Sequence, residues 1–169
     1  MIFQLRFGWL RSMIAVAAVA MTLGASAASA APIKGTWQTQ EGTEVNVTPC
    51  GADYCGVLSW IVIPHQYAAT CNADREKFGA QMLDTKNPDP SQRGRSLVGM
   101  QMMTLKPTSD PTRYDVHLYS SEDGKSYDGP AKIDGNSLNL QQCLGICITV
   151  QSWPRVPDRV GTPDFSCGS

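Results

Sequence analysis

The stretch that decides the fold is RYDVHLYSSEDGKSYDGPAKIDGNSLNLQQ, residues 113–142. Asp123-Gly124 and Asp134-Gly135 divide it into three segments, and Asp-Gly between alternating segments is a strong hairpin signal. In the first segment apolar side chains alternate with polar ones, as in a half-buried strand: Tyr114, Val116 and Leu118. The stretch therefore predicts three antiparallel strands joined by two hairpins, at 113–119, 126–133 and 137–142.

Strand-like segments continue on both sides of this stretch. Residues 56–63 are apolar on both faces, which indicates a strand that is covered on both sides. Eight short strands joined by tight turns predict an all-β fold, an eight-stranded antiparallel up-and-down barrel, because closure removes exposed sheet edges. A two-sheet sandwich with the same strand count is the alternative. The five further strands are expected at 34–40, 43–48, 56–63, 96–106 and 146–153.

Two segments are expected to lie outside the regular strands. Residues from about 64 to 95 show no helical period of useful length, so this segment is expected to be a long irregular loop. The tail from Pro154 carries several prolines and few apolar residues, so we expect an irregular strap tethered to the barrel by a disulfide.

The first thirty residues have the pattern of a secretory signal peptide. Arg6 and Arg11 precede a short apolar run, and Ala28-Ser29-Ala30 provides an Ala-x-Ala cleavage site. We assign residues 1–30 to the signal peptide and 31–169 to a single domain, located in the periplasm or secreted. An uncleaved anchor is the alternative, but the run is shorter than the ~20 apolar residues that span a bilayer.

The charge of the chain excludes some classes of partner. Removing Arg6 and Arg11 leaves 12 basic residues against 15 acidic ones, a net charge of −3 with both signs interspersed. This mild balance argues against nucleic acid, against an anionic membrane surface as main partner, and against stable membrane insertion.

All six cysteines follow the predicted signal peptide, and an even count in an exported chain indicates disulfides. Six cysteines allow 15 connectivities. The spacing favours Cys50–Cys55 and Cys143–Cys147, each closing a tight turn, and elimination then pairs Cys71 with Cys167. Zinc is the alternative reading of these spacings, but an oxidising compartment favours disulfides, so no metal or other cofactor is expected.

Several motifs resemble, in the same order, domain-of-unknown-function family 2147, a family of small exported bacterial proteins. The resemblance covers about residues 33–156, and it implies a lipocalin-like barrel in the cell envelope with no established reaction. The sequence departs from the family pattern in its long segment 65–83 and in its tail, which extends to Cys167. The motifs are GTWQT (35–39), PCGADYCG (49–56), NPDPSQRGRSLVG (87–99), YSSEDGKSY (119–127) and QSWPRV (151–156).

The polar stretch LDTKNPDPSQRGRSLVG, residues 83–99, holds the main candidate site residues. Asp84 and Asn87 can accept hydrogen bonds that Arg93 and Arg95 donate, which would order the loop as a strut closing one end of the barrel. The alternative is a clamp in which the two arginines bind an anionic group at the barrel mouth.

Candidate contacts for the apolar part of a ligand are Trp60, Met100 and Met102, with the two methionines expected on one strand face and Met103 on the other. A plain core role is the alternative for the methionines. Structural roles are assigned to Trp37, Trp153 and Arg155, with Arg155 stacked on Trp37, and to Asp123 and Gly124 in a hairpin turn.

No catalytic motif is found: Gly-x-Ser-x-Gly, His-Glu-x-x-His and glycine-rich phosphate loops are all missing from the sequence. We therefore expect a non-enzymatic, exported binder of a small, partly apolar or amphipathic ligand. The second hypothesis is an interaction protein with a filled barrel, such as an envelope stabiliser or a protease inhibitor, for which rigidity lowers the ordering cost of binding.

Overall fold

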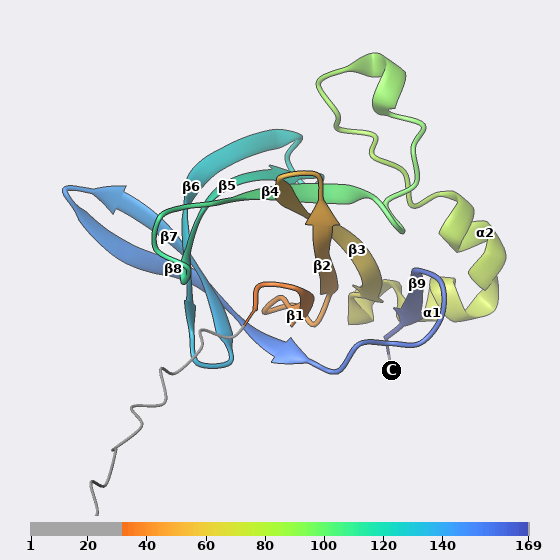
Figure 1. Cartoon of the computed structure of the whole chain (residues 1–169). Coiled ribbons are helices and arrows are strands. Elements are labelled where there is room, and N and C mark those ends of the chain that lie inside the picture. The colour runs from red at the N-terminus through yellow and green to blue at the C-terminus, as the bar shows by residue number, and fades with distance from the viewer. Residues whose placement is uncertain (1–31, 169) are drawn as a thin grey trace, which may run out of the picture.

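A computed structural model describes residues 32–168 and shows a closed eight-stranded antiparallel barrel (Figure 1). The predicted signal peptide, residues 1–30, lies outside the described residues. In the described part of the chain, no helix is long and apolar enough to cross a membrane. The barrel strands are β1 (Gly35–Gln38), β2 (Glu44–Cys50), β3 (Asp53–Ile63), β4 (Gln101–Pro107), β5 (Arg113–Ser120), β6 (Lys125–Asp134), β7 (Ser137–Leu144) and β8 (Ile146–Val156).

The predicted up-and-down topology is confirmed. Each of the eight strands pairs with its neighbours in sequence, β8 returns to β1, and the β2–β3 pairing completes the ring. The predicted Asp-Gly turns join β5 to β6 and β6 to β7, and both glycines have the positive φ that these turns require: +68° at Gly124 and +57° at Gly135.

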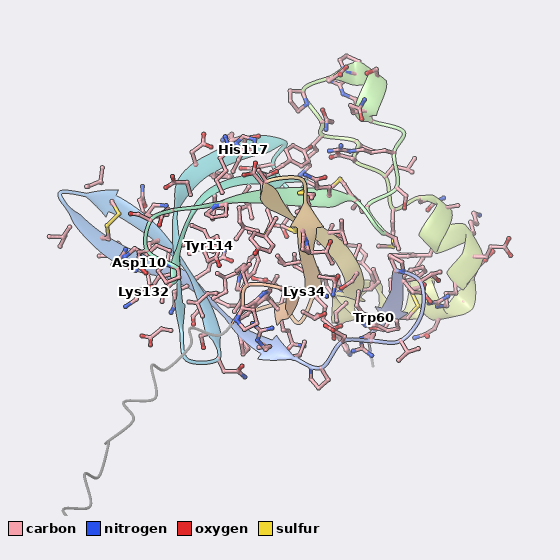
Figure 2. The ribbon with its side chains drawn as sticks, in the orientation of Figure 1. Lys34, Trp60, Asp110, Tyr114, His117 and Lys132 are labelled. Atoms are coloured by element: carbon pink, nitrogen blue, oxygen red, sulfur yellow. A yellow bond between two sulfur atoms is a disulfide. The ribbon has the colours of Figure 1, made fainter. Side chains whose placement is uncertain are left out.

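The barrel interior near Trp37, the lower barrel, is filled by inward-facing side chains. Trp37, Leu138 and Trp153 are fully or almost fully buried there, and Tyr114 projects into the same interior (Figure 2). The guanidinium of Arg155 lies 4.2 Å from the Trp37 ring centroid, and it also donates to the carbonyl of Lys34. Trp37 and Arg155 thus close the barrel at this end.

The expectation of an irregular segment over 64–95 is wrong in part, because the segment contains α1 (His65–Ala73), α2 (Arg75–Ala80) and a short 3-10 turn, η1 (Pro90–Gln92). These helices have no long apolar stripe. Their burial depends on single contacts: Cys71 joins Ile63, Met82 and Phe165 in a second small core. Such contacts come from tertiary packing, which a search for helical period does not detect.

The tail is also more regular than expected, since β8 runs to Val156 and β9 (Asp164–Cys167) pairs in parallel with β3. The side chain of Phe165 in β9 is buried against the second core. The three predicted disulfides are present: Cys50–Cys55 and Cys143–Cys147, which the spacing favoured, and Cys71–Cys167, which followed by elimination and ties the tail to α1. The second core and the tail explain why residues 56–63 are apolar on both faces.

The predicted face of the methionines is wrong. Met100 and Met103 are buried in the main core, whereas Met102 is only partly buried at its edge. The cause is a β-bulge: Gly56 pairs with Met103 but Val57 pairs with Gln101, so one extra residue reverses the alternation. Met100 lies before the strand, and its backbone is held by hydrogen bonds to Leu97 and Leu58.

Candidate functional site

The predicted polar loop is built around Asp84, whose side chain is fully buried. Its Oδ2 accepts from Asn87 Nδ2 at 2.6 Å and from Arg95 at 2.8 and 2.9 Å, and its Oδ1 accepts from the Tyr119 hydroxyl at 2.6 Å. Burial raises the pKa of Asp84, but the hydrogen bonds outweigh it and hold the pKa below the ordinary value of 3.8. At neutral pH Asp84 is therefore a charged anchor for the loop.

The arginines of this loop are used within it. Arg95 forms the ion pair with Asp84 and lies 5.4 Å from the centroid of the Tyr119 ring, and Arg93 donates through Nε to the carbonyl of Asn87 at 2.8 Å. This geometry matches the strut interpretation, because both guanidinium groups already hold protein acceptors. An anion-binding role for Arg93 and Arg95 stays a prediction that would require them to recruit a ligand alongside these contacts.

The loop is also docked onto the β5–β6 turn. Lys86 Nζ donates to the carbonyl of Glu122, and the carbonyl of Lys86 lies 2.0 Å from the position that a Cβ at Gly124 would take. Asp123 accepts hydrogen bonds from the backbone of Lys125 and from the hydroxyl of Tyr127. The Asp123-Gly124 turn thus serves both the hairpin and the loop that packs on it.

The barrel opens at the other side of this turn, where β7 and β8 leave the barrel. The β6–β7 pairing ends at the pair Ala131–Leu140, so the first half of β6 has no partner in β7. A cavity of about 510 Å³, which we call the mouth cavity, lies in this opening. Its apolar walls are Val116, Leu118, Tyr127, Pro130, Leu140 and Val150, and its polar residues include Glu122, Asp123, Asp128, Gln141 and Gln151.

Gln141, one of the residues that line this cavity, has a side-chain oxygen that is buried in the protein and accepts no hydrogen bond from any of residues 32–168. Its backbone packs closely on β6, because a Cβ at Gly129 would lie 2.8 Å from the backbone carbonyl oxygen of Gln141. An unpaired buried acceptor costs free energy until a donor reaches it.

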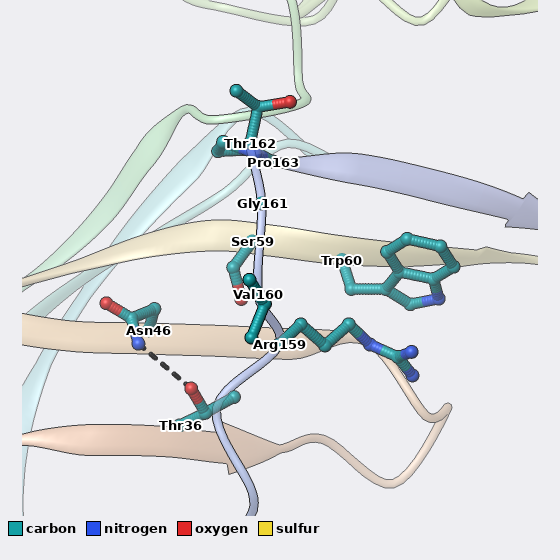
Figure 3. Close-up of a pocket in the computed structure, with 9 residues that line it drawn as sticks. All are labelled: Thr36, Asn46, Ser59, Trp60, Arg159, Val160, Gly161, Thr162 and Pro163. Atoms are coloured by element: carbon teal, nitrogen blue, oxygen red, sulfur yellow. Dashed lines mark hydrogen bonds between the residues drawn. The ribbon is translucent and has the colours of Figure 1, made fainter.

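A second cavity, also about 510 Å³, lies outside the barrel (Figure 3). It is covered by residues 157–163, the segment between β8 and β9 that we call the strap. The predicted ligand contact Trp60 lies here, along with Thr36, Asn46 and Ser59, and not in the main core, where Met100 is buried. Residues 159–163 of the tail form its outer wall.

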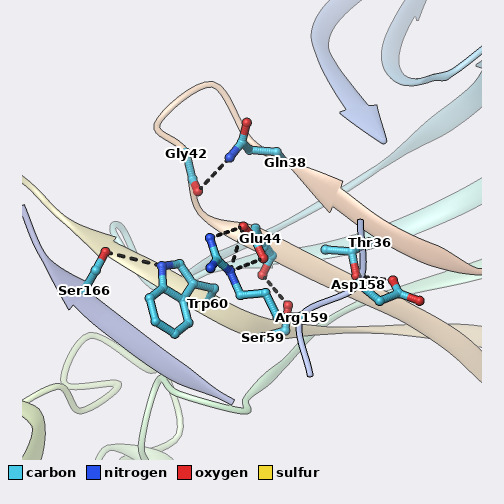
Figure 4. A network of polar contacts seen from close by, with 9 residues as sticks. All are labelled: Thr36, Gln38, Gly42, Glu44, Ser59, Trp60, Asp158, Arg159 and Ser166. Carbon is cyan, nitrogen blue, oxygen red and sulfur yellow. Dashed lines mark hydrogen bonds and ion pairs between the residues drawn. The ribbon is translucent and has the colours of Figure 1, made fainter. Parts of the chain in front are cut away.

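Buried Glu44 holds the strap over this second cavity (Figure 4). Arg159 donates hydrogen bonds to both carboxylate oxygens of Glu44 at 2.8–3.0 Å, and its guanidinium lies 4.2 Å from the Trp60 ring centroid. Nearby, Thr36 donates to Asp158 at 2.6 Å. Hydrogen bonding to Glu44 raises the pKa of Arg159 above its ordinary value, so the guanidinium stays charged.

The structure places the predicted site residues in three separate places. Asp84, Asn87, Arg93 and Arg95 do come together, Trp60 lies under the strap, and Met100 is in the core. The residues of the mouth cavity were missed as a site. Their alternation marked Val116, Leu118 and Leu140 as inward-facing, but nothing in the sequence indicated that β7 separates from β6 after Leu140.

The closed barrel with an opening at one end defines the class: this is a lipocalin-like barrel protein. A solved structure described as protein HP1028 from Helicobacter pylori, belonging to the lipocalin family, matches it with a TM-score of 0.53 at 20% identity, covering 74% of this chain and 83% of that chain. The chain belongs to the DUF2147 family, described as uncharacterized protein conserved in bacteria, whose model matches residues 35–155. No curated protein matches the chain.

Proposed function

We propose that this protein is an exported binder of a small, partly apolar ligand, which it holds in the mouth cavity between β6 and β7. The cavity of about 510 Å³ carries the proposal. Its volume lies within the range of about 300–1,000 Å³ that is usual for small-molecule sites, and mostly apolar walls with a few polar groups are typical of them. The signal-peptide pattern and the three disulfides support export.

The chemistry of the cavity indicates which ligand fits. The filled lower barrel leaves room for a compact apolar body, not for a long chain threaded through the lumen. The carboxylates Glu122, Asp123 and Asp128 line the cavity and disfavour an anion. We therefore infer a ligand with an apolar body and a neutral or cationic polar group.

A neutral fluorescent probe tests this proposal. N-phenyl-1-naphthylamine has two aromatic ring systems and one N–H donor, so it should bind saturably with a rise in fluorescence. Leu118→Asn places a polar group in the apolar wall and should weaken binding at least tenfold, whereas Val160→Asn, in the other cavity, should leave it unchanged. Failure of the wild-type protein to bind the probe, together with a native mass from periplasm that carries no adduct, would sink the proposal.

A second candidate function, a rigid barrel that presents a surface to a partner, is supported by one observation. The β7–β8 hairpin beyond the mouth exposes Leu144, Ile146, Ile148 and Val150. An exposed apolar patch on a small protein often marks an interaction site. Binding of the probe with unchanged affinity after substitution in the cavity would favour this second function over the first.

A further inference from the structure

The β7–β8 hairpin beyond residue 140 projects away from the barrel as a free ribbon (Figure 1). Beyond the pair Leu140–Gln151, β8 has an extra residue, Val150, so a bulge marks the point where the hairpin leaves the barrel. Near the tip, the disulfide Cys143–Cys147 joins the two strands on either side of the turn at Gly145. A two-stranded ribbon is marginally stable by itself, and this disulfide keeps the tip in shape.

One face of the hairpin carries aliphatic side chains from the barrel to the tip, with Gln142 among them. Leu144 lies opposite Ile146 and Gln142 opposite Ile148, so these side chains share the face that Leu140 presents to the barrel interior. Exposure rises outward along this face: Val150 is 49% exposed, Ile148 55%, Ile146 76% and Leu144 85%. We call these four residues the hairpin ridge. Val150, its innermost member, is also a wall of the mouth cavity.

The hairpin carries no charge. Residues 137–153 contain no aspartate, glutamate, lysine, arginine or histidine. An uncharged apolar tip can leave water without the desolvation cost of an ion. Its contact with a partner would therefore depend little on salt.

We propose that the hairpin ridge docks on the surface of a lipid bilayer, with Leu144 and Ile146 entering the boundary between headgroups and acyl chains. The most exposed residues lie at the extreme tip, as shallow insertion requires, and binding of this kind grows with the apolar area that is buried. Pairing with the β8 edge of a second copy is disfavoured, because the bulge at Val150 and the missing N–H of Pro154 interrupt that edge.

Because the hairpin ridge is continuous with the mouth cavity, docking on a bilayer would serve to transfer a ligand between the two. An apolar ligand leaving the bilayer would pass along Ile148 and Val150 into the mouth, with apolar contact at each step. This use rests on the proposed function, whereas docking itself rests on the hairpin alone. The docking experiment therefore contains no ligand, and a failure of probe binding would leave its result intact.

Flotation of the mature protein with phosphatidylcholine vesicles tests the docking. We expect the wild-type protein to float with the vesicles, equally at low and high salt. Ile146→Ser should reduce the floating fraction at least fivefold without changing the melting temperature, because its side chain contacts mainly solvent. Val160→Ser, which removes an exposed aliphatic side chain from the tail, is the matched control and should float as the wild type does.

A second variant reports the position of the tip directly. Ile146→Trp keeps the tip apolar, and its added fluorescence should be quenched when the vesicles contain brominated acyl chains, whereas that of Val160→Trp should not. Three results would overturn the docking: a wild-type protein that stays in solution, flotation that salt abolishes, and an Ile146→Ser change that dissociates a dimer without affecting flotation. The last result would assign the ridge to a second copy of the chain.

Discussion

At the scale of single residues, the structure depends on a few polar groups that are joined by hydrogen bonds between side chains. Asp84 joins three segments: the loop through Asn87, the loop end through Arg95, and the barrel through Tyr119. Burial and the hydrogen bond to Asp84 raise the pKa of Tyr119, so the phenol keeps its proton and remains a donor. The charge of Asp84 is therefore part of the fold.

Removal of that charge should destabilise the protein. Asp84→Asn weakens the acceptor for Tyr119 and leaves Arg95 without its counter-ion, and hydrogen bonds to charged groups contribute about 1.5–3 kcal/mol each in favourable cases. Because Arg95 is partly exposed, we expect a total loss of about 2–3 kcal/mol in the free energy of unfolding, measured by urea denaturation. Asp115→Asn, at an exposed position of β5, should change it by less than about 0.5 kcal/mol.

The same carboxylate gives the stability a pH dependence of known sign. The pKa of Asp84 is lower in the folded protein than its ordinary value of 3.8, so its contribution is complete above pH 4 and is lost as pH falls through the lower, folded value. Below pH 4 the wild-type protein should therefore lose stability faster than Asp84→Asn. Parallel stability curves for the two proteins below pH 4 would show that Asp84 does not carry this dependence.

Two glycines allow backbone conformation to be separated from close contact. Gly124 and Gly135 both have positive φ, but a Cβ at Gly124 would meet the carbonyl of Lys86 whereas a Cβ at Gly135 would meet nothing within 4 Å. Gly135→Ala should cost about 1 kcal/mol for conformation alone. Gly124→Ala should lower the free energy of unfolding distinctly more, when both variants are measured by thermal unfolding. Equal losses in the two variants would contradict the packing of the loop on this turn.

At the scale of elements, the described chain divides into a barrel and an attached layer of α1, α2 and β9. The layer has its own small core around Cys71 and Phe165, and the disulfide Cys71–Cys167 ties together its first and last elements. Arg159 fastens the strap that leads into β9 to buried Glu44. The layer is therefore held by its small core, by the pairing of β9 with β3, by a covalent tie and by an ion pair.

Removal of that tie should release the layer before the barrel. The double change Cys71→Ser and Cys167→Ser opens a long loop, so the free energy of unfolding should fall by about 2–4 kcal/mol. Hydrogen exchange should accelerate in α1, α2 and β9, with the amides of β5 and β6 still protected. Removing Cys143–Cys147, which closes a loop of few residues, should cost less and affect the hairpin tip; equal effects of the two double changes would contradict this division.

The sequence could predict those elements whose pattern is local. Alternation and Asp-Gly turns located the strands around residues 113–142, and cysteine spacing indicated two of the disulfides, from which the third followed by elimination. What depends on distant contacts was missed: the bulge that turns Met103 inward, the helices held by Cys71, and β9 on β3. The mouth cavity belongs to this second kind, because it exists only where β7 parts from β6.

At the scale of the whole molecule, the barrel has two different ends. One end is closed by Trp37 and Arg155, and the other has the cavity between β6 and β7 with the hairpin ridge leading away from it. Such an asymmetry suits a carrier that takes up a small ligand from one side. The second cavity, under the strap, has more polar walls and a charged pair at its edge, so an apolar ligand should prefer the mouth.

The measurement that tests the account most directly is an NMR titration of the mature, ¹⁵N-labelled protein with N-phenyl-1-naphthylamine. The account predicts saturable shifts of the amides of Leu118, Tyr127, Gly129 and Gln141, with those of Asn46 and Ser59 unmoved. Shifts confined to Asn46, Ser59 and the strap would place the ligand in the other cavity. Absence of saturable shifts anywhere in the protein would contradict a ligand-binding barrel altogether.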